Sequence, residues 1–285
     1  MEIIGDALSM DRNSVEKPHA IVVGASSDIG AALCRDWLER GWSVSGTYRT
    51  MSDEFSTLAR RLKVVVNADF SVARSVDGAG LLLKQQIPCW SVLVLAPGTQ
   101  DPIGAFSECD FDDWAQSITV NYVNQMRMVH ALLPNRSKGN DKEPSTVIFF
   151  AGGGVNNAPL NYSAYISSKI ALIKMTEILA AEIDDTKFVV VGPGWVNTKF
   201  HNALIRAAVG SNDSLKQSAE RLKTVSFTPL QKIVYCCNVL IAGDKNAVSG
   251  RNFSVVHDRW DTQQIYQELL RNDDMYKLRR FGNNN

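Results

Sequence analysis

Residues 19–41 read HAIVVGASSDIGAALCRDWLERG, and this stretch decides the fold. Its first six residues are a short apolar run with β-branched side chains that ends at Gly24, as a buried parallel strand does. The segment 29–41 then places apolar side chains on one helical stripe, and Gly41 suits a left-handed cap. The stretch therefore predicts a strand, a tight turn and a helix in direct succession.

The same alternation continues along the chain. Further apolar runs follow at intervals long enough for helical crossovers, and residues 163–183 form a long helical candidate. Because crossovers between parallel strands are right-handed, this order predicts an α/β fold. We expect a Rossmann-type doubly wound sheet of about seven parallel strands with helices on both faces. The expected strands are residues 19–24, 42–48, 62–67, 90–96, 145–151, 187–192 and 251–256.

We predict three parts in the chain. Residues 1–18 form a polar N-terminal extension, residues 19–260 a single domain, and residues 261–285 a C-terminal helix with a polar tail. Residues 199–227 are polar and irregular, and they interrupt the alternation of strands and helices. Long irregular segments often act as active-site lids, so this one is a candidate lid over a ligand.

Composition narrows the classes of function. Lys and Arg total 30 against 30 Asp and Glu, so no net field attracts nucleic acid or an anionic membrane. The five cysteines include no C-x-x-C pair, and the four histidines show no metal-ligand spacing. The sequence has neither a secretory signal pattern nor an apolar run long enough for a membrane span. We expect a cytoplasmic protein with a small-molecule substrate, without nucleic acid, membrane or metal partners.

The turn VGASSDIG (23–30) lies between the first strand and the first helix. Backbone amides and the helix dipole favour a bound phosphate at such a place. Its glycine spacing, G-x-x-x-D-x-G, matches neither the dinucleotide fingerprint G-x-G-x-x-G nor a P-loop. Taken alone, the turn fits a plain connection as well as it fits a nucleotide site.

Four motifs taken together resemble the short-chain dehydrogenases/reductases. They are VGASSDIG, Asn121 in VNYVNQ, Tyr165 and Lys169 in YISSK, and PGWVNT at 193–198, in the order and approximate spacing of that family. The resemblance covers about residues 19–257. It implies one Rossmann-type domain that binds a nicotinamide dinucleotide and moves hydride to or from a carbonyl or secondary alcohol.

The resemblance also implies which residues meet the cofactor. The matching positions lie in the first turn, after the third strand, in the LAPG segment and in the PGWVNT segment, together with the tyrosine and lysine of YISSK. They are Gly24, Ser26, Ile29, Gly30, Asp69, Ala96, Gly98, Tyr165, Lys169, Pro193, Gly194, Val196 and Thr198. LAPG stands where the family usually has Asn-Asn-Ala-Gly, and Asp28 replaces a customary glycine. A carboxylate beside a pyrophosphate is unfavourable unless Asp28 caps the helix amides.

The end of the second expected strand bears on the choice of cofactor. An acid there would accept a hydrogen bond from the ribose 2′-hydroxyl of NAD, but this chain has Tyr48 followed by Arg49. A guanidinium can hold the 2′-phosphate through charge-assisted hydrogen bonds. The sequence therefore favours NADP(H) over NAD(H), and an Arg49 that points to solvent is the alternative.

Tyr165 and Lys169 are four residues apart, so they share one helix face. A nearby ammonium stabilises phenolate and lowers the pKa of a tyrosine, which suits Tyr165 to pass a proton to a developing alkoxide. By resemblance, Lys169 also binds the nicotinamide ribose and Asn121 holds a water in a proton relay. A purely local hydrogen bond is the alternative role for Asn121.

The serine that the family uses would fall near Gly152, where this chain reads Ala-Gly-Gly-Gly. Loss of one donor to an oxyanion costs about a hundredfold to a thousandfold in turnover, which impairs an enzyme without ending its chemistry. We expect Gly152, Gly153 and Asn156 to meet the substrate, with main-chain N–H groups as substitute donors. The Gly- and Asn-rich loop suggests a small polar, sugar-like substrate.

Two functions follow from these motifs. The first is an NADP-dependent carbonyl reductase or alcohol dehydrogenase with an atypical active site that lacks the family serine. The second is a catalytically silent dinucleotide-binding sensor or scaffold. In either case we expect a homo-oligomer, a dimer or tetramer, because the helix at 163–183 carries more apolar surface than one sheet-facing stripe needs.

Overall fold

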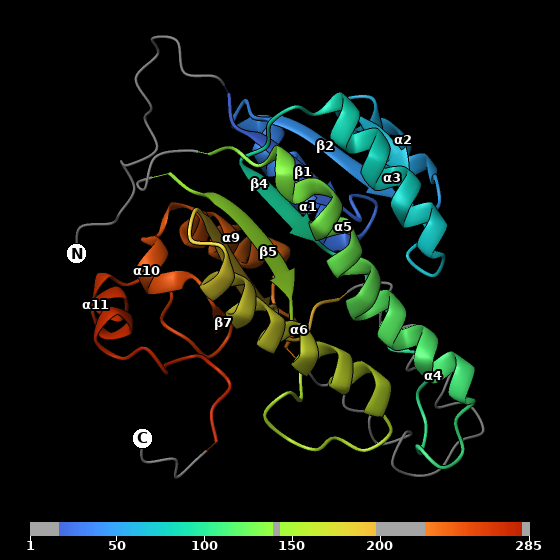
Figure 1. The fold of residues 1–285 in the computed structure, drawn as a ribbon, viewed down its shortest axis with the longest axis vertical. Coiled ribbons are helices and arrows are strands. Elements are labelled where there is room, and N and C mark those ends of the chain that lie inside the picture. The colour runs from blue at the N-terminus through green and yellow to red at the C-terminus, as the bar shows by residue number, and fades with distance from the viewer. Residues whose placement is uncertain (1–16, 139–142, 198–225, 281–285) are drawn as a thin grey trace.

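The computed structural model describes residues 17–138, 143–197 and 226–280. Its centre is one sheet of seven parallel strands in the order β3-β2-β1-β4-β5-β6-β7. Helices lie on both sides of this sheet (Figure 1). The strands are β1 His19–Val23, β2 Ser43–Tyr48, β3 Val65–Asn67, β4 Val92–Leu95, β5 Ser145–Phe150, β6 Thr186–Gly192 and β7 Arg251–Ser254. The predicted fold class is confirmed.

Nine helices of the described residues surround the sheet. They are α1 Asp28–Glu39, α2 Asp53–Ala59, α3 Ala73–Gln86, α4 Phe111–Ile118, α5 Asn124–Leu132, α6 Ser163–Glu182, α9 Leu230–Ala242, α10 Lys245–Val248 and α11 Gln263–Arg271. A π-helical turn, η1 Thr119–Val123, joins α4 to α5, and a short 3-10 turn, η2 Leu133–Asn135, follows α5.

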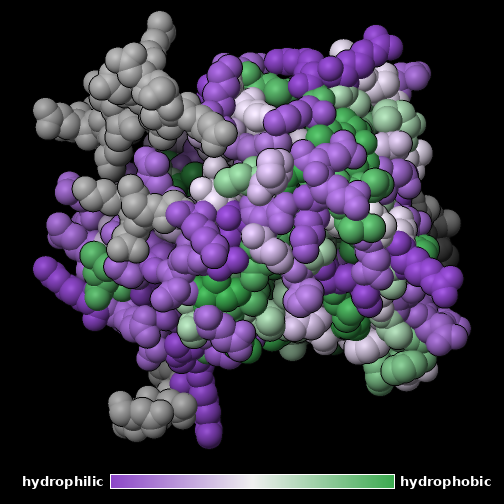
Figure 2. Space-filling view, turned by 45° about the horizontal axis from the view of Figure 1, so that its top comes forward, coloured by the Kyte–Doolittle hydropathy of each residue, from purple (hydrophilic) through white to green (hydrophobic). Residues whose placement is uncertain are grey.

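Alternate residues of each central strand pack into two separate hydrophobic cores, one on each face of the sheet. In β1, Ala20 and Val22 pack with α1 and α9, whereas Ile21 and Val23 pack with α3, α5 and α6. Both faces of the strand are covered, so its residues after His19 are all apolar instead of alternating with polar ones. Hydrophilic residues cover most of the face shown in Figure 2, and hydrophobic residues lie in small groups between them.

The first predicted helix is α1, which begins one residue earlier and ends two residues earlier than the apolar stripe suggested. Its N-cap is Ser27, whose hydroxyl accepts a hydrogen bond from the amide of Gly30. Gly41 follows the helix with a φ of +79°, the left-handed conformation that the sequence predicted there. The helix buries Leu33, Cys34 and Trp37 against the sheet and α9.

The chain reverses its direction of growth across the sheet between β1 and β4. From β1 it builds outward through β2 and β3, and it then returns to build β4 to β7 on the other side of β1. The carboxyl ends of all seven strands lie at one edge, since every pairing is parallel. Ligands of doubly wound sheets bind at this edge, beside the point of reversal.

Two buried cations fasten the last strands to their neighbouring helices. Lys187 in β6 donates to the main-chain oxygen of Ile241 in the last turn of α9. It also donates to that of Gly243, directly after the helix, at 2.9 Å. Arg251 in β7 donates to the oxygen of Leu269 at 2.8 Å and to main-chain oxygens just after α11. Each cation therefore lies at the negative end of a helix dipole.

Arg251 and α6 together hold the segment that follows α11. The guanidinium fixes the carbonyls of residues 272, 273 and 275, and the Glu177 carboxylate accepts from the amide of Leu278 at 2.8 Å. Arg279 completes the attachment with a 2.8 Å ion pair to Glu177. The segment thus returns to the carboxyl edge of the sheet. Residues 1–16 of the expected extension (1–18) and residues 199–225 of the candidate lid (199–227) lie outside the described residues.

Gly46 in β2 provides a test of how closely the first turn packs on the sheet. A Cβ at this position would lie 2.7 Å from both the Ala25 Cβ and the Val22 oxygen. We expect Gly46→Ala to lower the free energy of unfolding by about 1–3 kcal/mol, because the turn must shift to admit the methyl group. Urea denaturation followed by circular dichroism measures this change.

The matched control is Gly78→Ala in α3, where a Cβ would meet no atom within 4 Å. There alanine should stabilise the protein by about 0.5–1 kcal/mol through its better helix propensity. Equal effects of the two substitutions would contradict the close packing of β2 on the turn.

Candidate active site

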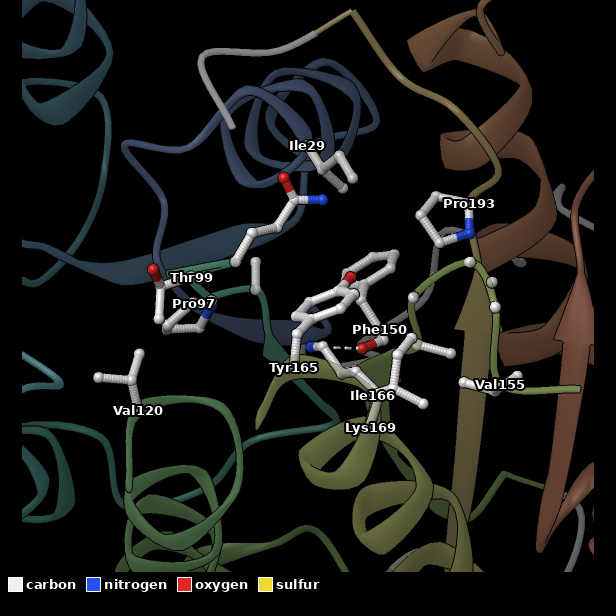
Figure 3. Close-up of a pocket in the computed structure, with 18 of the residues that line it drawn as sticks. Ile29, Pro97, Thr99, Val120, Phe150, Val155, Tyr165, Ile166, Lys169 and Pro193 are labelled. Carbon is white, nitrogen blue, oxygen red and sulfur yellow. Dashed lines mark hydrogen bonds between the residues drawn. The ribbon is translucent and has the colours of Figure 1, made fainter. Parts of the chain in front are cut away.

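A cavity of about 1320 Å³ opens at the carboxyl edge of the sheet. It extends from the turn after β1, past the ends of β4 and β5, to the segment after β6 and the C-terminal segment. Figure 3 shows Tyr165, Lys169 and Phe150 at its centre, with Ile29, Pro193 and Thr99 around them. The expected site residues that line it are Gly24, Ser26, Ile29, Arg49, Asp69, Ala96, Gly98, Gly152, Gly153, Asn156, Tyr165, Lys169, Pro193, Gly194 and Val196.

Three expected residues do not line the cavity. Gly30 is buried in α1, and Asn121 is fully buried in η1. Thr198 lies outside the described residues. The structure thus brings most of the motif residues to one cavity, although the motifs are far apart in the chain.

The turn after β1 can fold tightly because Gly24 and Gly30 have no side chains. A Cβ at position 30 would overlap the carbonyl oxygen of Gly24 and lie 2.9 Å from the Ser27 hydroxyl oxygen. Gly24 has a φ of +80°, and its amide donates to the Thr47 hydroxyl at 3.0 Å. Ser27 donates to the Gly24 oxygen at 2.7 Å and accepts from the Gly30 amide at 3.1 Å.

This geometry leaves the N-terminus of α1 facing the cavity. Ser26, Ser27, Asp28 and Ile29 all line it, so amides and the positive end of the helix dipole are available to an anion. The N-cap is Ser27, and Asp28 stands in the first helical turn. The arrangement fits the diphosphate of a dinucleotide, with the Asp28 carboxylate as an unfavourable neighbour.

Arg49 and Asp69 lie at the β2–β3 end of the cavity. The side-chain Nδ2 of Asn67 donates to the main-chain oxygen of Arg49 at 2.8 Å and to that of Tyr48 at 3.3 Å, which fixes the backbone after β2. The arginine side chain is exposed and lines the cavity.

Asp69 is held by its own loop. Its Oδ1 accepts from the amide of Ser71 at 2.9 Å and from the hydroxyl of Ser71 at 2.7 Å. The Ser71 hydroxyl is the main cause that lowers the pKa of Asp69, and the charge of Arg49 adds to it. A carboxylate is therefore held at the end of the cavity where the family resemblance implies contact with the adenosine.

The segment after β6 closes the other end of the cavity. Pro193, Gly194 and Val196 line it, and a Cβ at position 194 would lie 2.6 Å from Val256 and 2.7 Å from the Thr228 hydroxyl. The amide of Thr228 donates to the Trp195 oxygen at 2.6 Å. A small residue at position 194 is what lets this segment pass under its neighbours.

Tyr165 and Lys169 lie on the cavity-facing side of α6, as the spacing predicted. The Lys169 ammonium donates to the Phe150 main-chain oxygen at 2.8 Å and lies 5.8 Å from the centre of the Tyr165 ring (Figure 3). Burial lowers the pKa of Lys169 to about 8. Burial also raises the pKa of Tyr165 well above its ordinary value, with the neighbouring Tyr162 as a lesser cause.

These shifts correct one sequence-based expectation. The sequence predicted that Lys169 would lower the pKa of Tyr165, whereas in this structure the tyrosine pKa is raised. The reason is that both side chains are almost completely buried, and the loss of water disfavours phenolate and ammonium alike.

The glycines after β5 stand directly against Tyr165. A Cβ at position 152 would overlap the hydroxyl and ring of Tyr165, whereas one at 153 would meet nothing within 4 Å. With the tyrosine in this position, no side chain fits at residue 152. Gly153 and Asn156 are both exposed toward the cavity, where the sequence placed the substrate.

The side chain of Asn121 holds the loop after β4 through hydrogen bonds. Its Oδ1 accepts from the Thr99 amide at 2.9 Å, and its Nδ2 donates to the Thr99 oxygen at 2.9 Å and to the Ser117 hydroxyl at 3.2 Å. The side chain therefore clamps the cavity wall at Thr99. The π-helical turn that carries Asn121 alters the backbone pattern there, and the role of Asn121 in holding a water stays a prediction.

Sequence reasoning missed several residues of the site. Ser27 had a recognisable signal, since serine directly before a helix is a favoured N-cap. Tyr162 also had one, since it precedes Tyr165 by three residues and so shares its helix face. Residues 276–278 line the cavity as well, but their approach depends on contacts with Arg251 and Glu177 that no local pattern predicts.

The described residues contain neither a metal-binding cluster nor a membrane-spanning helix. No group of three or more His, Cys, Asp and Glu side chains in this part of the chain is placed to hold a metal ion. Likewise, none of the described helices combines the length and apolar character needed to cross a bilayer.

Comparison with known proteins identifies the relatives of this chain. Residues 18–208 match the family model described as short chain dehydrogenase. An uncharacterized oxidoreductase of Saccharomyces cerevisiae is 31% identical over 131 residues, which cover 46% of this chain and 48% of that protein. A short chain dehydrogenase of Emericella variicolor is 26% identical over 189 residues, which cover 62% of this chain and 64% of the relative. The chain therefore spans less than two thirds of the length of these curated relatives.

Solved structures agree on the fold. The crystal structure of a Saccharomyces cerevisiae short chain dehydrogenase/reductase superposes with a TM-score of 0.72 at 21% identity, covering 85% of this chain and 98% of that one. A Pseudomonas aeruginosa protein in complex with NADP superposes with a TM-score of 0.70 at 18% identity, covering 87% and 98%. At these identities the likeness establishes the fold alone.

The dry environment of Lys169 has a measurable effect on stability. Its folded pKa of about 8 lies below the unfolded value of 10.5, so the unfolded chain binds more protons between these values and stability rises with pH there. We expect the free energy of unfolding of the ligand-free protein to increase from about pH 7.5 to 9.5, by at most about 3 kcal/mol from this residue. Denaturant unfolding at several pH values measures the slope.

Lys169→Gln should flatten part of that slope, and the exposed Lys84→Gln should leave it unchanged. Lys187 keeps its own share, because burial also lowers its pKa to about 8. The measurement stays below pH 10, where the raised pKa of Tyr165 begins to act in the opposite direction. An identical slope in wild type and Lys169→Gln would show that the ammonium is not desolvated.

Proposed function

The chain belongs to the short chain dehydrogenase family, and from this premise we propose that it is an NADP-dependent carbonyl reductase or alcohol dehydrogenase. We propose a small polar, sugar-like carbonyl compound or secondary alcohol as its substrate. The observation that carries the proposal is the placement of Tyr165 and Lys169 on one face of α6, in the same cavity as the N-terminus of α1. An oxidoreductase of this family needs a proton donor and a dinucleotide site in one cavity.

The reaction divides between cofactor and protein. NADPH, when bound, supplies the hydride that forms the new C–H bond. As the C=O electron pair moves to oxygen, Tyr165 gives its hydroxyl proton to that oxygen, and the product is an alcohol. Oxidation of an alcohol follows the same path in reverse, with NADP⁺ as the hydride acceptor.

Lys169 prepares the tyrosine for this step. Its ammonium lies 5.8 Å from the Tyr165 ring centre, where a positive charge favours the phenolate that remains after proton transfer. Its present partner, the Phe150 oxygen, lies at the cavity wall, so Nζ is placed to exchange it for ribose hydroxyls. The side chain of Asn121 positions the cavity wall at Thr99. Its main chain in η1 is our candidate for the group that binds the water of the proton relay.

Substrate contacts are proposed for the loop after β5. Gly152 and Gly153 permit a close approach of the substrate to the backbone, and Asn156 and Asn157 bring amide groups to the exposed rim. Amides that both donate and accept suit a substrate with several hydroxyl groups. The loop thus supports the choice of a polar substrate. The missing family serine makes this an atypical site, for which a slow turnover is expected.

The proposed preference for NADP rests on Arg49. The side chain is exposed, lines the cavity and forms no ion pair within 4 Å among the described residues, so its guanidinium is available to a 2′-phosphate. Tyr48 offers no carboxylate to repel that phosphate. All five cysteines are free, which fits the reducing cytoplasm where we place the protein.

We also propose a homo-oligomer. On α6, Ile170 and Ile178 remain 36% and 42% exposed, and Val123 at the neighbouring end of η1 is 42% exposed. A second copy that covered this face would bury those side chains. Sedimentation equilibrium at micromolar concentration should therefore give a dimer or tetramer, and a monomer would refute this proposal.

Tyr165→Phe tests the catalytic proposal. The variant keeps the ring that fills the space beside Gly152 but lacks the proton, so NADPH oxidation should fall to background while NADPH binding persists. The assay follows NADPH absorbance with a panel of pentanal, cyclohexanone, ethyl acetoacetate and glyceraldehyde. Tyr235→Phe on α9, outside the cavity and 47% exposed, is the matched control.

Two outcomes would contradict the proposal. If the Tyr165→Phe variant turned over like the wild type, the tyrosine would not be the proton donor. If the wild type bound NADPH tightly but reduced no carbonyl of the panel, the catalytically silent dinucleotide-binding function would replace the enzymatic one.

Arg49→Ala tests the choice of cofactor. One charge-assisted contact contributes about 1.5–3 kcal/mol, so wild type should bind NADPH roughly tenfold to a hundredfold more tightly than NADH. The variant should lose most of this difference while its affinity for NADH stays nearly unchanged. Calorimetry measures both affinities, with the exposed Arg271→Ala as control. Equal affinities in the wild type would mean that Arg49 points to solvent and that the NADP assignment is wrong.

A further inference from the structure

The oxyanion corner beside Tyr165 has room for no side chain at residue 152. A Cβ there would overlap the Tyr165 hydroxyl, so the backbone of Gly152 and the phenol already fill this space. A side-chain donor to a carbonyl oxygen that accepts the proton of Tyr165 must therefore come from another part of the cavity wall. One preorganised donor matters at this position, because negative charge develops on the oxygen during the reaction.

Most hydroxyl groups of the cavity wall are already engaged. Ser27, Thr47, Ser71, Thr99, Ser117, Ser254 and Tyr276 each use the hydroxyl in a contact with the protein. Ser26 belongs to the first turn at the N-terminus of α1, where the phosphates would lie. Within the described residues, the hydroxyl of Tyr162 has no hydrogen-bond partner, although the residue is half-buried and lines the cavity.

Other polar groups near the glycines are less suitable. The Ser163 hydroxyl accepts from the Trp114 indole at 3.0 Å, and Ser163 does not line the cavity. Asn156 and Asn157 line the cavity but are exposed to solvent, which would compete for a hydrogen bond to the substrate oxygen. Among the hydroxyl groups near the glycines, that of Tyr162 is therefore our candidate for the donor.

The position of Tyr162 suits the role. It is the N-cap residue of α6 and precedes Tyr165 by three residues, and both residues line the cavity. The two groups are close enough for Tyr162 to raise the pKa of Tyr165. Burial raises the pKa of Tyr162 itself to about 12, so it remains a neutral donor at physiological pH.

We propose that Tyr162 donates a hydrogen bond to the substrate carbonyl oxygen and replaces the hydroxyl that the chain lacks at residue 152. The inference rests on the proposed function. During reduction, Tyr165 transfers its proton to the oxygen, whereas Tyr162 keeps its own proton and stabilises the developing negative charge. The two tyrosines thus divide the tasks of proton donor and oxyanion stabiliser.

The first test measures binding without turnover. The probe is 4-nitrophenolate, whose oxyanion imitates the developing alkoxide, titrated into the NADP⁺-loaded protein at about pH 8, where the tyrosines are protonated. A hydrogen bond to a charged oxygen contributes about 1.5–3 kcal/mol, so Tyr162→Phe should bind the probe roughly tenfold to a hundredfold more weakly than wild type. Tyr235→Phe should bind it like wild type, and the melting temperature of each variant verifies folding.

The second test is kinetic and uses the carbonyl of the panel that wild type reduces fastest. Tyr162→Phe should lower kcat by about a hundredfold to a thousandfold, with kcat/KM falling by the same factor and NADPH affinity unchanged. Equal falls identify an interaction made only in the transition state.

The outcomes separate this inference from the proposed function. Equal probe binding by wild type and Tyr162→Phe, no probe binding by wild type, or a wild-type kcat in the variant would each overturn the role of Tyr162. A wild type that reduces no carbonyl would refute the proposed function, and the probe titration would still decide whether Tyr162 forms an oxyanion site.

Discussion

The site depends on how closely the turn after β1 can fold against itself. The carbonyl oxygen of Gly24 occupies the space that a Cβ of residue 30 would need, and the Ser27 hydroxyl bridges the same two residues. Any larger residue at position 30 would push α1 away from the sheet. Because the turn is closed, the first amides of α1 face the cavity instead of the sheet, and the dipole of a twelve-residue helix points at the same place. The remaining walls are assembled around that fixed end.

The fold was predictable because parallel strands covered on both faces need apolar residues on both faces. β4 is therefore an unbroken apolar run, β1 is apolar after His19 and β5 is apolar after Thr146, and their ends differ from the predicted ones by at most two residues. The placement of Tyr165 and Lys169 on one face was predictable for a related reason. Tyr165 and Lys169 lie on one helix, so their spacing alone determines that they share a face.

The unpredicted parts of the site depend on main-chain groups and distant contacts. Every residue has a carbonyl, so the sequence does not reveal that Lys169 donates to that of Phe150. The clamp of Asn121 on Thr99 needs a π-helical turn, a hydrogen-bond pattern without a recognised sequence period. The approach of Leu278 to the cavity is set by Glu177, about one hundred residues earlier in the chain.

The buried lysines of this protein show how similar environments serve different purposes. Lys187 and Lys169 are both dry, and burial lowers the pKa of each to about 8. Lys187 is surrounded by carbonyl oxygens at the end of α9, where charge-assisted hydrogen bonds and the helix dipole partly offset its burial. Lys169 has one such oxygen, and the cavity lies beside it. Its charged form is therefore left open to stabilisation by a ligand.

This incomplete compensation links ligand binding to proton transfer. Hydroxyl oxygens placed beside the Lys169 ammonium would favour its charged form, and a firmly charged ammonium favours phenolate at Tyr165. In this structure, burial disfavours the charged forms of both Lys169 and Tyr165. Tyr165 is therefore a poor proton donor and acceptor near neutral pH. A ligand that restores polar partners to Lys169 would change both pKa values in the catalytically useful direction. A hydroxyl-bearing ligand would thus strengthen the acid-base chemistry of the cavity, because it would supply the polar partners that burial withholds from Lys169.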